Sequence, residues 1–184
     1  LSAAKKGDDA LLRVLVHEFE KQGFKVLGSH EVHAKLLAPE GVIAGAKPTS
    51  EQMEDILHGA RVASATGALD IGQGAVVCEG LVLAVEAQEG TDSMLERCRT
   101  LPEEIRGTEF ARKGVLVKRP KPGQELRIDL PTTGVSTVEK VAAAGLAGLA
   151  VEAGGALLLD RRRMVERAEE LGVFIYGFAP EDEA

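Results

Sequence analysis

Positively charged residues concentrate in one part of the sequence, where they could bind an anion. Residues 112–127 contain six lysines and arginines and a single acidic residue, Glu125, so their local net charge is +5. The whole chain of 184 residues has 29 acidic residues against 22 lysines and arginines, a net charge of −7. A basic stretch in an acidic protein is typical of a site for a phosphate-bearing ligand. The acidic average argues against a general nucleic-acid binder.

Within this stretch, residues 126–130 alternate strictly between apolar and charged side chains. Such alternation predicts a β-strand with an apolar face and a charged face, and the charged face would carry Arg127 and Asp129. Two interpretations stay open. The charged face is either solvated, with an ion pair along the strand, or it forms one wall of the anion site.

A cluster of carboxylates is the second candidate group. Glu86, Glu89 and Asp92 lie within seven residues, at the start of a short predicted helix. Carboxylate oxygens are ligands that Mg²⁺ accepts. The structural alternative is that a polar residue at this position only caps the helix, and the candidates for the cap are Thr91, Asp92 and Ser93.

Two glycine-rich segments could present backbone N–H groups to an anion. Residues 70–74 include Gln73 but match neither the Walker nor the dinucleotide-binding pattern, and residues 152–155 begin with Glu152 at the end of a predicted strand. An ordinary turn is the alternative for both. No pattern typical of a serine or cysteine nucleophile is present. Carboxylate-plus-metal chemistry on a phosphate is therefore the chemistry that these residues allow.

Short strands alternating with helices must position these residues. Helices are expected at residues 9–22, 51–65, 91–98, 138–146 and 161–171. Strands are expected at residues 24–27, 75–77, 81–86, 114–118, 126–130, 148–152, 156–160 and 173–176. The predicted fold class is α+β or mixed α/β, with a mixed sheet and flanking helices. Five Phe, one Tyr and no Trp leave the core to aliphatic residues and offer few platforms for stacking bases.

The chain is expected to contain four segments. Residues 1–45 are interpreted as the remnant of an N-terminal α/β domain, 46–67 as a linker and connecting helix, 68–178 as a C-terminal catalytic domain and 179–184 as an acidic tail. Because the first residue is Leu1 and the first helix and strand lack neighbours, we expect a truncated form. No apolar run reaches the roughly 18 residues of a membrane span. The two cysteines show no metal-ligand spacing, so we expect a reducing, cytoplasmic compartment.

Several stretches occur in an order that resembles one enzyme family. They are residues 69–74, 85–92, 114–118, 121–124, 127–134 and 144–155. As an ordered set, between about Gly7 and Gly177, they resemble the UDP-2,3-diacylglucosamine pyrophosphatases of lipid A biosynthesis. The form in question occurs in many Gram-negative bacteria and is unrelated to the calcineurin-like enzyme.

This resemblance implies Mg²⁺-assisted hydrolysis of UDP-2,3-diacylglucosamine to UMP and 2,3-diacylglucosamine 1-phosphate. It places the essential aspartate of the family on Asp92, as a catalytic residue and metal ligand, with Glu89 as its catalytic neighbour. The implied substrate-binding residues are Gln73, Lys118, Gln124, Arg127, Asp129, Thr132 and Glu152. The resemblance also implies a homodimer, and the acyl chains call for an apolar chamber or peripheral contact with the inner membrane. The alternative is a non-catalytic module that binds a nucleotide-sugar or acyl-sugar phosphate.

Overall fold

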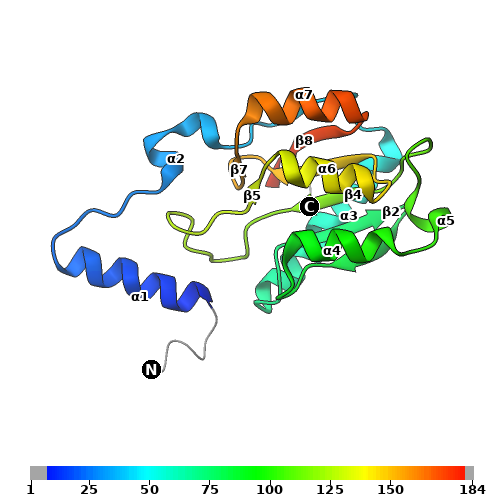
Figure 1. Ribbon diagram of the computed structural model, residues 1–184. Helices are drawn as coiled ribbons and strands as arrows, with labels where there is room; N and C mark the ends of the chain where they lie inside the picture. The colour runs from blue at the N-terminus through cyan, green and yellow to red at the C-terminus, as the bar shows by residue number, and fades with distance from the viewer. Residues whose placement is uncertain (1–7, 181–184) are drawn as a thin grey trace.

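Residues 8–180 are described by a computed structural model, in which six strands form one mixed sheet (Figure 1). Their order across the sheet is β1-β8-β6-β4-β2-β3. In that order the strands span Gly41–Ala44, Phe174–Phe178, Gly148–Glu152, Val115–Lys118, Gly74–Cys78 and Leu81–Val85. The three central strands β8, β6 and β4 are parallel, whereas β1, β2 and β3 pair antiparallel with their neighbours. The predicted mixed sheet with flanking helices is confirmed.

Helices cover both faces of this sheet. Helix α3 (Ser50–Ala68) lies on one face, and α4 (Gly90–Arg99), α6 (Val135–Ala143) and α7 (Arg161–Leu171) lie on the other. Because both faces are covered, β4 and β6 are buried at every residue, which explains their continuous apolar sequences. The connections from β4 to β6 and from β6 to β8 contain α6 and α7, as parallel neighbours require.

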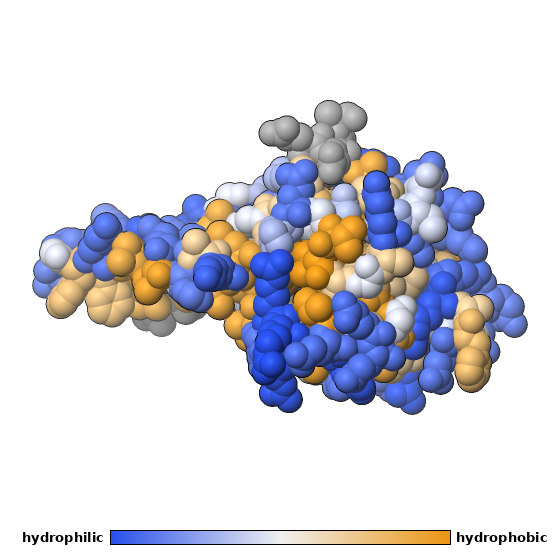
Figure 2. Space-filling model, turned by 90° about the horizontal axis from the view of Figure 1, so that it is seen from above, coloured by the Kyte–Doolittle hydropathy of each residue, from blue (hydrophilic) through white to orange (hydrophobic). Residues whose placement is uncertain are grey.

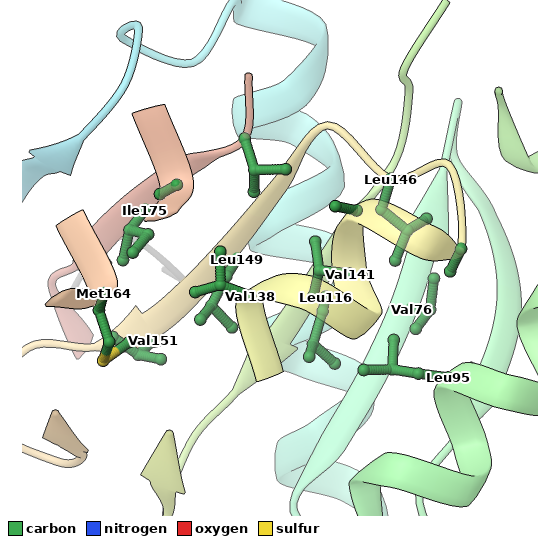
Figure 3. Close-up of a cluster of buried hydrophobic side chains, with 14 of the residues drawn as sticks. Val76, Leu95, Leu116, Val138, Val141, Leu146, Leu149, Val151, Met164 and Ile175 are labelled. Atoms are coloured by element: carbon green, nitrogen blue, oxygen red, sulfur yellow. The ribbon is translucent and has the colours of Figure 1, made fainter. Parts of the chain in front are cut away.

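The larger part of the hydrophobic core lies between the sheet and the three helices on one face (Figure 3). Leu95 of α4, Val138 and Val141 of α6 and Met164 of α7 point toward the sheet. The sheet side chains that meet them are Val76, Leu116, Leu149, Val151 and Ile175. On the opposite face Ile56 and Ala60 of α3 form a smaller cluster with residues of β4, β6 and β8.

Hydrogen bonds of side chains fix the start of α3 and the turn of the β2–β3 hairpin. Thr49 Oγ1 accepts the N–H of Gln52 at 3.2 Å, and Gln52 Oε1 accepts the N–H of Thr49 at 2.9 Å, which is a reciprocal N-terminal cap. Buried Asp55 of α3 accepts the N–H groups of Glu79 and Gly80 at 2.9 and 2.7 Å. These two residues have positive φ, as a tight hairpin turn between twisted strands requires. Glu79 and Gly80 thus form the turn that joins the antiparallel strands β2 and β3.

Two predicted strands are wrong. Residues 24–27 are irregular, and Phe24 is 64% exposed, with its ring packed edge-on against Phe19 at 6.2 Å. Residues 126–128 form a turn and residues 129–130 are irregular, and the carbonyl of Glu125 accepts the N–H groups of Ile128 and Asp129 at 3.1 and 3.0 Å. Alternation predicts which side chains share a face only when a neighbouring strand is available for pairing, and neither segment has one among the described residues.

The predicted strand at 156–160 is largely wrong as well, because β7 spans only Leu157–Leu158. It pairs in parallel with β5 (Thr132–Thr133), apart from the main sheet. Helix α6 starts earlier than predicted: its N-cap is Gly134, and no side chain of the described residues caps it. A short helix α5 (Glu103–Arg106) follows α4.

The N-terminal part forms an arm that projects from the body (Figures 1 and 2). It comprises α1 (Asp8–Lys21), α2 (Ser29–Val32) and the 3₁₀ helix η2 (Ala34–Leu36). The first predicted helix therefore exists, with several apolar side chains exposed to about half of their area, including Val14, Leu15 and Phe19. No helix among residues 8–180 is both long and apolar enough to span a membrane.

The expected segments map onto this structure as follows. Strand β1 lies within residues 1–45 but pairs with β8 in the main sheet, and α3, expected as a connecting helix, packs on the face of that sheet. The first part of residues 1–45 and most of the acidic tail at 179–184 lie outside the described residues.

Candidate functional site

The candidate site lies at the edge of the sheet where the central parallel strands end. Lys118 is the last residue of β4, and Glu152 is the last residue of β6. Gln73 directly precedes β2, which runs antiparallel to β4 and therefore starts at the same edge, with Gly74 opposite Lys118. Open sheets with parallel strands bind ligands at this carboxyl edge. The fold thus brings together residues from three of the ordered motifs.

Lys118 takes part in a buried hydrogen-bond chain with Thr91 and Glu86. Its ammonium donates to Thr91 Oγ1 at 2.6 Å, and the Thr91 hydroxyl donates to Glu86 Oε1 at 2.9 Å. Glu86 Oε2 lies 4.0 Å from Lys118 Nζ, and the two side chains are only 8% and 5% exposed. Burial lowers the pKa of Lys118, while the negative charges of Glu86 and Asp92 oppose that shift. The site therefore holds a cation in a poorly solvated position.

Asp92 lies in the first turn of α4 and is accessible. Its side chain is 59% exposed, and Oδ2 lies 2.5 Å from Nζ of Lys140 on α6. The alternative that Asp92 caps the helix is wrong, because α4 begins at Gly90 and its N-cap position is Glu89. Ser93 does not cap it either, since it lies inside the helix. Asp92 is thus an exposed carboxylate near a helix N-terminus, where negative charge is stabilised.

Glu89 faces a different partner. Its Oε1 accepts from Arg97 Nη2 of the same helix at 2.5 Å, and hydrogen bonds from its own backbone N–H and from Arg97 lower its pKa. The structure therefore gives Glu89 a contact along α4, and within residues 8–180 no hydrogen bond or ion pair joins it to Lys118 or Asp92. Its catalytic role stays a prediction.

A second, largely buried ion pair joins the residue after β4 to the last residue of β6 at the same edge. Arg119 Nη2 lies 2.8 Å from Glu152 Oε2, and both side chains are largely buried. The backbone N–H of Arg119 donates to the carbonyl of Gln73 at 3.1 Å, so Arg119 also contacts the segment before β2. A Cβ atom on Gly155 would lie 2.8 Å from Glu152 Oε1 and 2.9 Å from Cδ of Pro120, so the absence of a side chain leaves room for both residues. Gln73, Arg119 and Glu152 are therefore held together by direct contacts.

Three of the remaining predicted residues lie in the loop between β4 and β5, drawn yellow-green in Figure 1, and the fourth, Thr132, is the first residue of β5. Gln124 Oε1 accepts the N–H of Lys121 at 2.8 Å, and its amide donates to Asp129 Oδ2. Arg127 pairs with Glu125 and with Glu20 of α1. The ion pair with Asp129, which one of the two interpretations contained, does not form. Thr132 donates to the carbonyl of Leu130 at 3.0 Å. The loop thus orders itself largely through its own side chains.

Some residues of this site were not singled out from the sequence. Glu86 is one of three clustered carboxylates without an assigned role, Thr91 is considered only as a cap, and Arg119 is one of six basic residues in its stretch. Lys140 gives no local signal, because its partner Asp92 lies far away along the chain. In the structure Glu86 is buried directly after β3, and Lys118 is buried at the end of β4, a strand that is buried at every residue. No alternation in the sequence marks either side chain as inward-facing.

The residues present can be tested for their fit to Mg²⁺. Among the described residues, no group of three or more His, Cys, Asp or Glu side chains could hold a metal ion. Mg²⁺ commonly uses only one or two protein carboxylates, and the phosphates of the substrate complete its shell. The exposed carboxylate of Asp92, near the buried cation Lys118, fits such a shared site.

Comparison with known proteins gives the family. A family model described as "LpxI C-terminal domain" matches residues 39–176, and one described as "LpxI N-terminal domain" matches residues 1–36. The chain belongs to the LpxI family. The family inferred from the ordered motifs is thereby confirmed, and the carboxyl edge of the sheet lies in the C-terminal LpxI domain.

Alignment with a curated LpxI protein shows how much of the length of that relative this chain spans. The UDP-2,3-diacylglucosamine pyrophosphatase LpxI of Caulobacter vibrioides is 55% identical over 180 residues. This alignment covers 98% of the chain and 64% of the Caulobacter protein, so the chain spans just under two thirds of the length of this relative.

Proposed function

We propose that the protein hydrolyses the pyrophosphate bond of UDP-2,3-diacylglucosamine, which yields UMP and 2,3-diacylglucosamine 1-phosphate for lipid A biosynthesis. Membership of the LpxI family and the pyrophosphatase activity for which the Caulobacter relative is named support this proposal. The observation that carries it is the meeting of Lys118, Arg119 and the exposed carboxylate of Asp92 near one edge of the sheet. Cations are needed there because a diphosphate must be held while negative charge shifts to the leaving group.

In the proposed reaction the chain positions and neutralises the diphosphate. Lys118 offers an ammonium that is shielded from water, so its attraction for a phosphate oxygen is stronger than that of a surface lysine. Arg127 would add a guanidinium from the loop, and Gln73 and Gln124 would add amide groups. Asp92 would hold Mg²⁺, with Glu89 as its nearest acidic neighbour in sequence. When bound, the ion would polarise the phosphoryl oxygens and lower the pKa of a bound water.

The Asp92 assignment can be tested by measuring UMP release in the presence of Mg²⁺. We expect Asp92→Asn to lower kcat/KM by about 100-fold or more, because an electrostatic group of the transition state is lost. Glu96→Gln is the matched control, since Glu96 is also an exposed carboxylate of α4, and it pairs with Arg99. We expect the control to keep the wild-type rate. Near-normal turnover by Asp92→Asn would contradict the assignment.

A second comparison separates catalysis from binding alone. Calorimetric titration with UMP measures binding in the wild type and in Asp92→Asn. An enzyme in which Asp92 acts on the reaction loses turnover in the variant and keeps nucleotide binding. A binding module releases no UMP in either protein, and that result would replace the proposed activity with the alternative function.

We further propose a cytoplasmic protein that contacts the inner membrane peripherally and forms a homodimer. The acyl chains of the proposed substrate require an apolar environment, which supports the membrane contact. Flotation with phospholipid vesicles that contain the substrate tests the contact, and light scattering tests the dimer. Absence from the vesicle fraction, or a monomer mass, would contradict the respective proposal.

A further inference from the structure

The hydrogen-bond chain Lys118–Thr91–Glu86 has a fixed direction. An ammonium group can only donate, so Thr91 Oγ1 must accept from Lys118 Nζ at 2.6 Å. The hydroxyl hydrogen of Thr91 is then available for Glu86 Oε1 at 2.9 Å. The carboxylate therefore fixes the rotation of the hydroxyl, and the hydroxyl fixes the position of the ammonium.

Glu86 itself has little room to move. Its backbone N–H donates to the carbonyl of Gly74 at 2.9 Å. A Cβ atom on Gly74 would lie 2.5 Å from Glu86 Oε2, and a Cβ atom on Gly72 would lie 2.0 Å from the Glu86 carbonyl oxygen. Because these two glycines have no side chain, Glu86 can pack against the start of β2. Its carboxylate therefore forms a fixed end of the hydrogen-bond chain.

The hydrogen bonds of Thr91 also fix the first turn of α4. No described side chain caps this helix, because Glu89 at the N-cap position makes no capping hydrogen bond. Thr91 follows the first helical residue, and its side chain joins the turn to β4 through Lys118 and to the end of β3 through Glu86. Asp92 is the next residue. Its backbone position therefore depends on Thr91.

We propose that Glu86 is a positioning residue, which acts through Thr91 to fix the ammonium of Lys118 and the turn that carries Asp92. This inference rests on the proposed function, since it assigns the purpose of the arrangement to that reaction. Glu86 contacts no reacting atom in this proposal. Its carboxylate also compensates the buried charge of Lys118, which would otherwise be costly.

Thr91 offers the sharpest test, because valine has the shape of threonine without its hydroxyl. We expect Thr91→Val to lower kcat by about 10- to 100-fold with little change in KM, as for other residues that orient a catalytic group. Thr91→Ser keeps the hydroxyl and should recover most of the rate. Glu86→Gln keeps an acceptor for Thr91 but removes the charge beside Lys118, so we expect a loss of about tenfold.

Asp55→Asn is the matched control, because Asp55 is also a buried, hydrogen-bonded carboxylate but lies on α3 at the β2–β3 turn. It should lower the thermal stability and leave kcat near the wild-type value. A wild-type kcat in Thr91→Val would overturn the inference. So would equal losses in Thr91→Val and Thr91→Ser, or a loss of kcat in Asp55→Asn as large as that in Thr91→Val.

A structural readout separates this inference from the proposed activity. If the wild-type protein releases no UMP, the proposed activity fails, and crystal structures of Thr91→Val and Glu86→Gln decide about positioning alone. Displacement of the Lys118 ammonium and of the first turn of α4 would support the inference. Unchanged positions in both variants would overturn it.

Discussion

Glu125 and Arg127 form a bidentate ion pair in the loop after β4. Glu125 Oε1 accepts from Nε, and Oε2 accepts from Nη2, each at 2.8 Å. Paired contacts of this kind are the stronger form of a carboxylate–guanidinium interaction. The hydrogen bond from Arg127 is the main cause that lowers the pKa of Glu125 to about 2.

This shift predicts how the ion pair responds to acid. A carboxylate whose pKa is depressed in the folded protein stabilises the fold above its unfolded pKa, and this stabilisation is lost as the pH falls toward the folded value. We expect the Glu125 carboxyl to titrate with a pKa of about 2 by carbon NMR, and in Arg127→Gln to titrate nearer the ordinary glutamate pKa of 4.5. Arg162→Gln on α7 should leave this titration unchanged. A Glu125 midpoint at the ordinary glutamate value in the wild type would contradict the pairing.

At the scale of the elements, buried apolar contacts should outweigh surface charges. Leu149 of β6 is fully buried below α6 and α7, whereas Arg167 of α7 forms partly exposed ion pairs with Glu139 and Glu170 at 2.9 and 2.8 Å. We expect Leu149→Ala to lower the free energy of unfolding by about 2–5 kcal/mol and Arg167→Ala by less than about 1 kcal/mol. Urea denaturation measures the free energy of unfolding of both variants. A loss in Arg167→Ala as large as that in Leu149→Ala would contradict the prediction that packing outweighs surface charge.

The elements with a buried apolar pattern are those that the sequence predicted well. Helices α3, α4 and α7 and strands β2, β4 and β6 lie close to their predicted ranges, because each has a face or a run that must be covered. The segments 24–27 and 126–130 failed, since strand pairing is a long-range property. The contacts of the site are also long-range, so Lys140 opposite Asp92 and Arg119 opposite Glu152 could not be foreseen from spacing.

At the scale of the whole molecule, different kinds of contact hold the body together and attach the arm to it. The sheet and its helices share a continuous core, whereas polar contacts join α1 to the loop after β4. They include those of Glu20 with Arg127 and of Arg13 with the Gly123 carbonyl. Val14, Leu15 and Phe19 of α1 are exposed to about half of their area, whereas Val16 of the same helix is buried. None of these four residues belongs to the hydrophobic clusters of the body, from which the arm projects (Figure 2). The body therefore does not depend on α1 for its core.

We predict that removal of residues 1–33 leaves a cooperatively folded protein. The far-ultraviolet circular dichroism should lose only the signal of α1 and α2, and the melting temperature should change little. Binding of a hydrophobic dye should decrease, because exposed apolar side chains of the arm are gone. A control that retains the arm but carries Phe19→Ser should show part of the same decrease. A truncated protein without a cooperative transition would show that the arm is needed for the core.

Glu20 of α1 lies 2.6 Å from Nη1 of Arg127, so the arm supplies a negative charge that pairs with this guanidinium of the loop. An incoming anion that takes Nη1 of Arg127 has to displace this carboxylate, so occupancy of the loop and attachment of α1 become competing states. Thermodynamic reciprocity then requires that release of the arm favours anion binding by the same free energy that anion binding contributes to releasing the arm. Salt screens both exchange partners, so the balance between them follows the ionic strength of the surroundings.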